Sequence, residues 1–259
     1  MTRILLLGGS SEASRLAAAL ASRGVDGVFS YAGRTRHPIP QPLAMRVGGF
    51  GGIDGLIDYL GRNAITHVVD ATHPFAAGMS RNAIAAAGAL GLPLLALERP
   101  PWRAIGGDRW IAAADVDAAV RDLPANPSRI FLAIGRQNIA AFAARPEHHY
   151  LLRLVDQPDP DVPLPLGSYE FVVSRGPFTV VDDTALLKER RIDWVVSKNA
   201  GGSEAGAKIE AARNLGLPVS MIARPSIPDR PTVATVDEAL QWLGFVSTPT
   251  LHHEPRLGV

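Results

Sequence analysis

The first cluster of residues that could do chemistry in this 259-residue chain is the turn at residues 8–13, with the sequence GGSSEA. It follows the apolar run at residues 4–7. Glycines at such a turn let the backbone approach a phosphate, and the N–H groups and dipole of a helix start attract its charge. The turn lacks the G-x-G-x-x-G pattern, so a tight turn without a ligand is the alternative. The interpretation places a phosphate on Gly8, Gly9, Ser10, Ser11 and Glu12.

The turn after the second apolar run, at residues 28–31, bears on which nucleotide would bind. A protein that prefers NAD usually carries an acidic residue here, which holds the ribose 2′-hydroxyl. This chain has no acid at that place and offers Gly33, Arg34, Thr35 and Arg36 instead. Guanidinium groups form paired, charge-assisted hydrogen bonds to phosphate, so the turn favours NADPH over NADH. The alternative is that both arginines are solvated loop residues.

Four glycines stand within the five residues 48–52, just before a predicted helix. Glycine loses more backbone entropy on folding than any other residue, so such a density needs a reason. A loop that passes close against a flat ligand would supply one, and we expect Gly49 and Gly51 to contact the cofactor. A mobile loop without a ligand is the alternative.

The segment DATHPFA at residues 70–76 places an acid and a histidine where the fourth strand should end. Ligands of open α/β sheets collect at the carboxyl ends of strands. Asp70 and His73 therefore suggest a proton relay, and Thr72 is expected either to cap the next helix or to contact the cofactor. A hydrolytic triad or a zinc protease site is not indicated, because neither G-x-S-x-G nor H-E-x-x-H occurs.

The segment SKNAGGSEAGAK at residues 197–208 occupies the same place in the second half of the chain. A strand end, glycines and a helix start again predict an anion cradle, now with Lys198 at the strand edge. Lys198 could carry charge or a proton there. The structural alternative is an ion pair between Lys198 and Glu204.

Short apolar runs alternate with alanine-rich amphipathic stretches, which indicates parallel βαβ units. Residues 156–167 contain four prolines and are predicted to be a loop. The predicted strands are residues 4–7, 28–31, 67–70, 92–97, 129–134, 171–174, 193–197 and 218–222. The predicted helices are residues 12–22, 53–62, 76–90, 180–190 and 205–215, with a final helix opening at residue 236.

The second half of the chain partly repeats the first. The sequence GLP at residues 91–93, followed by Arg99 and Pro100, is matched by GLP at residues 216–218, followed by Arg224 and Pro225. The repeat predicts an α/β fold of two related, Rossmann-like, parallel-sheet domains with the active site in the cleft between them. Any two βαβ units look somewhat alike, which is the alternative. We expect the domains at residues 1–124 and 128–246, a tail at residues 247–259, and a cleft lined by residues 70–76 and 197–203.

Composition excludes several classes of function. A formal net charge of +1 creates no global field for nucleic acid or an anionic membrane. The absence of cysteine excludes disulfides, thiolate metal sites and cysteine nucleophiles. The first apolar run stops at Gly8, too early for a signal peptide, and no long apolar span follows. We expect a cytoplasmic protein without a metal, and without nucleic-acid or membrane partners.

Taken together, these motifs resemble those of the precorrin-6A reductase family in order and spacing. The resemblance extends to about residue 245, and residues 70–76 and 175–178 are its most specific parts, because a βαβ fold does not require them. Residues 197–203 depart somewhat from the acidic-glycine version of relatives. The motifs that carry the resemblance are residues 8–13, 32–35, 47–52 with 55–56, 70–76, 98–100, 134–136, 175–178 and 198–208 with 224–225.

The resemblance implies that NADPH reduces one double bond of the tetrapyrrole precorrin-6A, giving precorrin-6B, in cobalamin biosynthesis. Asp70, His73 and Lys198 are then candidate catalytic residues, and neighbouring pathway enzymes are candidate partners for handover. The substrate carries many carboxylates, whose expected partners are Arg136, Arg153, Arg175 and Lys198, each with a structural ion pair as its alternative. Two other functions stay open: a reductase of another substrate and a non-catalytic nucleotide-sensing module. Against a short-chain reductase, no tyrosine is followed by a lysine four residues later.

Overall fold

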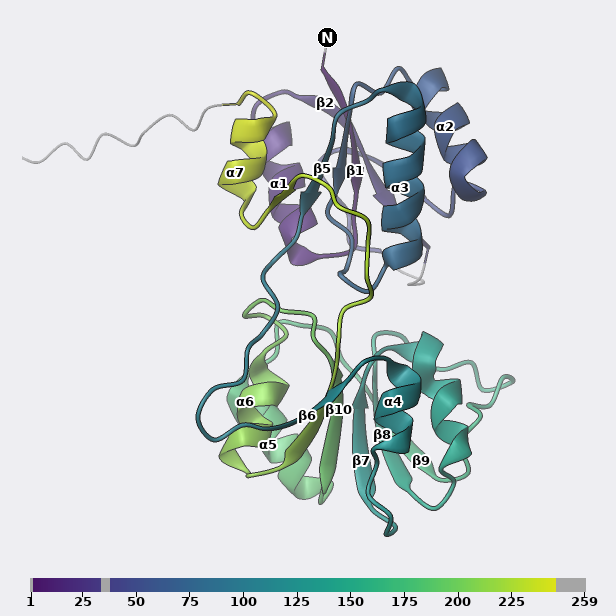
Figure 1. The fold of residues 1–259 in the computed structure, drawn as a ribbon, viewed down its shortest axis with the longest axis vertical. Coiled ribbons are helices and arrows are strands. Elements are labelled where there is room, and N and C mark those ends of the chain that lie inside the picture. Colours follow the sequence, from purple (N-terminus) through teal and green to yellow (C-terminus); the bar gives the residue numbers. More distant parts are fainter. Residues whose placement is uncertain (1, 34–37, 246–259) are drawn as a thin grey trace, which may run out of the picture.

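In the computed structural model, the described residues 2–33 and 38–245 form two parallel six-stranded β-sheets, each with helices on both faces (Figure 1). The two sheets belong to two domains, stacked along the long axis of the molecule. The elements of the first half are β1 (Arg3–Leu7), α1 (Ser11–Ala21), β2 (Asp26–Tyr31), β3 (Ala44–Val47), α2 (Gly52–Arg62), β4 (His67–Asp70), α3 (Ala77–Leu90) and β5 (Leu94–Leu97).

A further strand and helix, within residues 109–121, end the first half, and the second half then repeats the whole order with one irregular helix. The elements are β6 (Arg109–Ala113), α4 (Val116–Arg121), β7 (Arg129–Ala133), the 3-10 helix η1 (Arg136–Ala144), β8 (His149–Leu154), β9 (Tyr169–Val173), α5 (Val180–Glu189), β10 (Trp194–Lys198), α6 (Ala207–Asn214), β11 (Pro218–Ile222), β12 (Thr232–Val233) and α7 (Val236–Trp242). The predicted alternation of strands and helices, and the irregular segment at residues 156–167, are confirmed.

The two halves exchange their last strand and helix. The strand order is β12-β5-β4-β1-β2-β3 in the first sheet and β6-β11-β10-β7-β8-β9 in the second. The chain therefore crosses between the domains twice, through residues 98–108 and 223–231. The predicted boundaries, 1–124 and 128–246, are wrong at this point, because β6 and α4 pack on the second domain while β12 and α7 pack on the first. The predicted tail at residues 247–259 lies outside the described residues.

Continuous apolar runs form the centre of each sheet because both faces of a parallel sheet are covered. Ile4, Leu5, Leu6 and Leu7 of β1 are at most 1% exposed. In the first domain one face packs under α1 and α7 and the other under α2 and α3. In the second domain α4 and η1 cover one face, and α5 and α6 the other.

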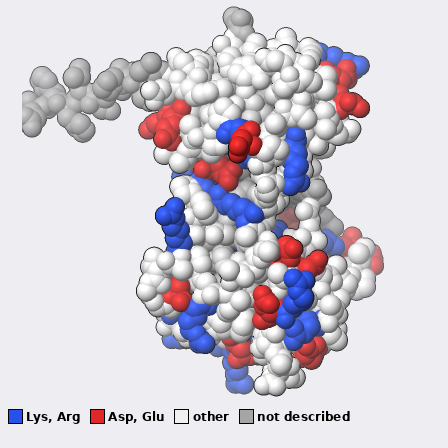
Figure 2. Space-filling model, in the orientation of Figure 1, with Lys and Arg blue, Asp and Glu red and all other residues white. Residues whose placement is uncertain are grey.

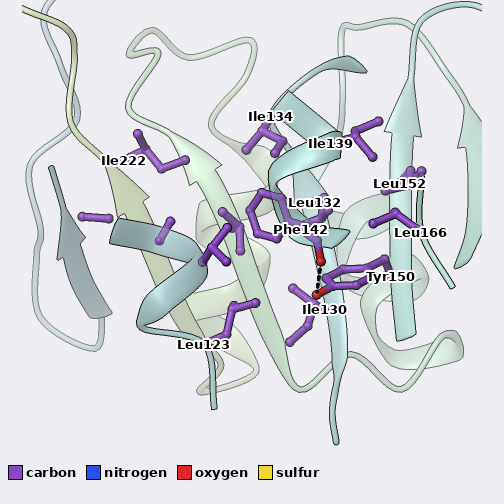
Figure 3. Packing of buried hydrophobic residues seen from close by; sticks show 14 of the residues in the cluster. Leu123, Ile130, Leu132, Ile134, Ile139, Phe142, Tyr150, Leu152, Leu166 and Ile222 are labelled. Carbon is purple, nitrogen blue, oxygen red and sulfur yellow. Dashed lines mark hydrogen bonds between the residues drawn. The ribbon is translucent and has the colours of Figure 1, made fainter. Parts of the chain in front are cut away.

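The core under η1 includes a buried polar contact. Figure 3 shows Tyr150 against Phe142, where the tyrosine hydroxyl donates a hydrogen bond of 3.2 Å to the Phe142 carbonyl. It also lies 2.7 Å from the Arg145 carbonyl. The Phe142 carbonyl also accepts a hydrogen bond from the Arg145 N–H at the end of η1, so the tyrosine hydroxyl shares its one proton between two carbonyls at this helix end.

The surface has no extended region of one charge on the face shown in Figure 2, where acidic and basic side chains are interspersed. This agrees with the formal net charge of +1. Within residues 2–33 and 38–245, no helix combines the length and apolar character that a membrane crossing would need.

Candidate functional site

A cavity of about 840 Å³ lies between the two domains, at the carboxyl ends of their strands. The first domain contributes His73, Phe75 and Met79 to its wall, and the described lining on that side contains no Lys, Arg, Asp or Glu. The second domain contributes Arg136, Arg153, Asp156 and Lys198. A cleft between the domains is therefore present, and residues 73, 75 and 76 of the predicted segment 70–76 line it, but of the predicted segment 197–203 Lys198 alone does so. The two walls differ in charge, one apolar and one largely cationic.

The glycine turn after β1 has the backbone geometry of a helix start that could hold an anion. Ser10 caps α1 by accepting a hydrogen bond of 3.2 Å from the Ala13 N–H, while its hydroxyl donates to the Ala71 carbonyl at 2.7 Å. Gly9 has a φ of 142°, which favours glycine. The first N–H groups of a helix have no partner within it, so this turn fits a phosphate.

Gly8 is required for a different reason. A Cβ atom at this position would lie 2.0 Å from the ring of Phe29, which is fully buried. The position of Gly9 also links the turn to the next part of the site, because a Cβ there would lie 3.8 Å from the backbone nitrogen of His73. The predicted cofactor turn and the predicted catalytic histidine are therefore neighbours.

The side chain of Glu12 is engaged by protein cations. Its carboxylate lies 2.9 Å from Arg99 and 3.0 Å from Arg15, and it accepts a hydrogen bond from Ser11 at 3.3 Å. Burial raises the pKa of Glu12, but hydrogen bonds and the two arginines outweigh it, so the pKa lies below its usual value. The carboxylate thus stays ionised, and any contribution of Glu12 to anion binding comes from its backbone.

Asp70 supports the loop after β4 through hydrogen bonds to Thr72. It is 3% exposed, does not line the cavity, and accepts hydrogen bonds from the Thr72 N–H at 3.2 Å and the Thr72 hydroxyl at 2.7 Å. Helix α3 begins at Ala77 with Ala76 as its cap, so the prediction that Thr72 caps it is wrong. The side chain of Thr72 is used by the aspartate instead. No hydrogen bond joins Asp70 to His73 among the described residues.

His73 is a neutral hydrogen-bonding group. Burial, reinforced by nearby arginines and lysines, lowers the pKa of His73 from 6.5 to about 4. Its Nδ1 accepts a hydrogen bond of 3.2 Å from the Phe75 N–H, which assigns the proton of the neutral ring to Nε2. At neutral pH His73 can donate a hydrogen bond but is a poor source of an imidazolium proton.

Lys198 faces the cavity as a cation. Its Nζ lies 5.1 Å from the centre of the Phe75 ring, and burial lowers the pKa of the amine. The alternative partner, Glu204, pairs instead with Arg15 at 3.4 Å. Within the described chain no carboxylate lies within 4.0 Å of Lys198.

Other segments of the protein pack closely against the glycines that follow Lys198. The prediction that these glycines form a second anion cradle is therefore wrong. A Cβ at Gly201 would lie 2.1 Å from the Pro100 carbonyl oxygen, and one at Gly202 would lie 2.6 Å from Cδ of Arg99. Both glycines have positive φ, near 70° and 76°. The segments that cross between the domains thus fill the space above this loop.

The predicted substrate-binding arginines occupy different environments. Arg136 lines the cavity, is exposed, and has no ion pair with a described residue. Arg153 also lines the cavity, but it forms a two-pronged ion pair with Asp183 and lies 4.4 Å from the centre of the Phe178 ring. Arg175 lies outside the cavity lining and pairs with Asp156 at 2.7 Å.

The glycine-rich loop before α2 is held by Arg46, a residue that no sequence motif singles out. Arg46 donates to the carbonyls of Gly48 and Gly49 at 2.9 and 3.0 Å, and its guanidinium lies 3.7 Å from the centre of the Phe50 ring. A Cβ at Gly33 would lie 3.5 Å from Gly48, so the two predicted cofactor loops lie against each other.

Part of the predicted cofactor site is not described. Gly51 is the N-cap of α2 and has a φ of 83°. Arg34, Thr35 and Arg36 lie outside the described residues, and the structure leaves their predicted role untested.

Comparison with known proteins identifies the family to which the chain belongs. Residues 3–244 match the family described as Precorrin-6x reductase CbiJ/CobK. This chain belongs to the precorrin-6x reductase family. A precorrin-6A reductase from Rhodobacter capsulatus is 57% identical over 243 residues, which cover 94% of this chain and 96% of that protein. A solved structure of CobK precorrin-6A reductase matches with a TM-score of 0.91 and 56% identity, covering 96% of this chain and 99% of the other.

A second group of relatives is more distant. A cobalt-precorrin-6A reductase from Priestia megaterium is 28% identical over 249 residues, covering 93% of this chain and 97% of that protein. Membership of this family of reductases makes the chain an oxidoreductase, and a reductase of this kind implies a nicotinamide cofactor.

Proposed function

We propose that this protein uses NADPH to reduce one double bond of metal-free precorrin-6A, giving precorrin-6B, in the assembly of the corrin ring of cobalamin. The observation that carries the proposal is the asymmetric cavity. The glycine turn after β1, which would hold a phosphate, adjoins the apolar wall at His73, and the opposite wall carries Arg136 and Lys198. A nucleotide and a polycarboxylate ring need these two chemistries on opposite sides of one site.

The cofactor half of the proposal rests on the turn after β1. The N-terminus of α1 would hold a phosphate, and Gly33 would let the backbone approach closely. NADPH is favoured over NADH because residues 31–33 include no acid and two arginines follow at positions 34 and 36. When bound, the cofactor supplies hydride, while the protein supplies orientation and electrostatics.

The substrate half rests on the charge of the second-domain wall. Lys198 and Arg136 would meet carboxylates at the edge of the ring, while Phe75 and Met79 offer apolar surface to its conjugated part. His73, neutral with its proton on Nε2, would donate a hydrogen bond to the substrate from a position between the cationic and apolar surfaces. These groups orient the ring, and orientation alone can supply a large part of the barrier reduction.

The absence of cobalt from the substrate is inferred from the relatives. The compared relative named precorrin-6A reductase is 57% identical to this chain, whereas the one named cobalt-precorrin-6A reductase is 28% identical. Residues that adapt the cavity to one ring should follow the closer relative.

The test is an anaerobic assay of the purified protein with precorrin-6A and NADPH. We expect NADPH absorbance to fall as a product that is two hydrogens heavier forms. Cobalt-precorrin-6A in place of precorrin-6A should be reduced more slowly. Binding of NADPH without oxidation in the presence of either ring would identify a nucleotide-sensing module instead.

Cofactor preference is tested by titrating the wild type and Arg34→Ala with NADPH and NADH. Loss of one guanidinium contact to phosphate should weaken NADPH binding by about tenfold to a hundredfold. NADH binding should change little, because NADH has no 2′-phosphate. Equal affinity of the wild type for both nucleotides would contradict the preference.

A further inference from the structure

Two arginines that the internal repeat pairs, Arg99 and Arg224, converge on the loop that follows Lys198. Nε of Arg99 donates to the Ala200 carbonyl at 2.9 Å, and Nη2 of Arg224 donates to the same oxygen at 3.0 Å. Nε of Arg224 also donates to the Asn199 carbonyl at 2.9 Å. Each arginine comes from a different crossing segment, so both segments hold one loop.

The side chain of Asn199 adds a third attachment. It accepts a hydrogen bond of 2.8 Å from the Trp102 N–H and donates one of 3.0 Å to the Trp102 carbonyl. Because Asn199 directly follows Lys198, these bonds fix the backbone from which the lysine extends. The close approach of Arg99 to Gly202 leaves the loop little room to move.

Arg99 differs from Arg224 in reaching the first domain. Nη1 of Arg99 lies 2.9 Å from Glu12, the second residue of α1, whose start forms the anion-binding turn. The far end of Arg224 instead pairs with Glu98, within the crossing segment, at 2.6 Å. The Arg99 and Glu12 side chains are only 12% and 10% exposed, so solvent screens their attraction less than at the surface. One side chain thus connects the turn with the Lys198 loop.

We propose that Arg99 is a positioning residue, which fixes Lys198 relative to the anion-binding turn by bonding Glu12 at one end and Ala200 at the other. The proposal rests on the proposed function, in which the turn holds the nucleotide and Lys198 meets the tetrapyrrole. Arg99 does not line the cavity, so it acts through these two neighbours. A misplacement of about 1 Å between reacting groups can cost about a hundredfold in rate, which sets the scale of the effect.

The experiment compares Arg99→Ala, Arg99→Lys and the control Arg213→Ala. Arg213 pairs with Asp108 of the same crossing segment at 2.9 Å and is also largely buried, but it contacts neither Glu12 nor the Lys198 loop. Each variant is measured for kcat and KM with precorrin-6A, for the Kd of NADPH by titration, and for thermal stability.

We expect Arg99→Ala to lower kcat by about tenfold to a hundredfold, with the KM of precorrin-6A and the Kd of NADPH within about threefold of wild type. Arg213→Ala should lower the melting temperature but leave kcat unchanged. Arg99→Lys keeps a charge near Glu12 but lacks the guanidinium fork that spans both partners. It should therefore recover stability without recovering kcat, and it carries the test if Arg99→Ala does not fold.

Three results would overturn the proposal, and they are distinguishable. If the wild type is active and Arg99→Lys has the same kcat, Arg99 has no positioning role, but the proposed function stands. A Kd for NADPH that rises as much as kcat falls makes Arg99 a cofactor-binding residue. A wild type that does not turn over precorrin-6A removes the proposed function and this proposal with it.

Discussion

The two domains share one topology but differ at the edge where they meet. After β1 the first domain has a regular helix of 11 residues, capped by Ser10, whose start presents backbone N–H groups. After the corresponding strand β7, the second domain has the 3-10 helix η1, which begins at the exposed Arg136 and is preceded by Gly135 at a φ of 77°. The first edge offers peptide dipoles and the second offers cationic side chains.

Under the proposed function, this difference would let one scaffold serve two kinds of anion. Backbone N–H groups at a helix start suit a phosphate of fixed geometry, because they are rigid and set by the fold. Long cationic side chains suit carboxylates spread around the edge of a large ring. Away from these edges, the helix-covered cores of both domains consist mainly of apolar side chains.

Each domain also holds an arginine over an aromatic ring, with different partners. Arg46 in the first domain bonds the Ser30 hydroxyl at 2.8 Å and two loop carbonyls. Arg153 in the second domain bonds Asp183, which is 2% exposed. We therefore expect the second arginine to depend far more on its partner than the first.

The largest expected effect is that of Asp183→Asn. Burial lowers the pKa of Lys208 to about 8, and Asp183 opposes this shift, so the aspartate balances both Lys208 and Arg153. Its neutralisation leaves buried positive charge uncompensated, which should cost about 3–5 kcal/mol of unfolding free energy. The matched change in the first domain, Ser30→Ala, removes one neutral partner and should cost about 1 kcal/mol.

Chemical denaturation of both variants at neutral pH measures this contrast. Equal losses for Asp183→Asn and Ser30→Ala would show that the two arginines depend on their partners to the same degree.

The second effect concerns the cationic edge. Lys198→Ala should lower kcat/KM for precorrin-6A by about a hundredfold, because it removes from the site a partly buried cation that has no carboxylate partner among the described residues. A rise in KM with intact NADPH affinity indicates carboxylate binding. A fall in kcat with unchanged KM indicates proton donation. A lower melting temperature with both kinetic constants near wild type would remove Lys198 from the site.

The sequence predicts the buried central strands of the fold but not the strands whose pairing depends on the rest of the structure. The runs at residues 4–7 and 67–70 were readable because their burial on both faces leaves continuous apolar sequence. Strands β3, β6, β8 and β12 were missed. β12 has two residues, and its pairing depends on which sheet has a free edge, which no local pattern records.

Site residues at strand ends could also be predicted from the sequence, whereas those that depend on tertiary contacts could not. His73 and Lys198 were placed at strand ends and do line the cavity. The glycines at positions 201 and 202 were misread, because a glycine that admits a ligand and one that admits another segment look identical in sequence. Arg46 and Arg99 act through contacts that only the fold creates, so neither arginine could have been assigned its contact.

The third effect is a pH dependence that belongs to the first domain. His73 has a pKa of about 4 in the folded protein and about 6.5 when unfolded. Between these values the unfolded chain binds the proton and the folded protein does not. Stability should therefore fall as pH drops from about 6.5 to about 4, by about 3 kcal/mol at most from this group.

Denaturation midpoints of wild type and His73→Gln, measured across that pH range, isolate the contribution. The difference between the two proteins should change steadily below pH 6.5 and level off near pH 4. A constant difference across the range would show that His73 is protonated equally in both states.

The smallest expected effect tests whether the exchanged segments join the two domains into one folding unit. Asp115 caps α4 by accepting from the Ala118 N–H at 2.7 Å, and Thr235 caps α7 by accepting from the Glu238 N–H at 3.2 Å. Loss of either cap by substitution with alanine should cost about 1 kcal/mol.

Helix α4 belongs to the first half of the sequence but packs on the second domain, and α7 belongs to the second half but packs on the first domain. Because each domain is completed by a segment from the other half, we expect a single unfolding transition that both variants shift equally, with tryptophan fluorescence and far-ultraviolet circular dichroism coinciding. If the domains instead unfold separately, Asp115→Ala will shift only the transition of the second domain and Thr235→Ala only that of the first.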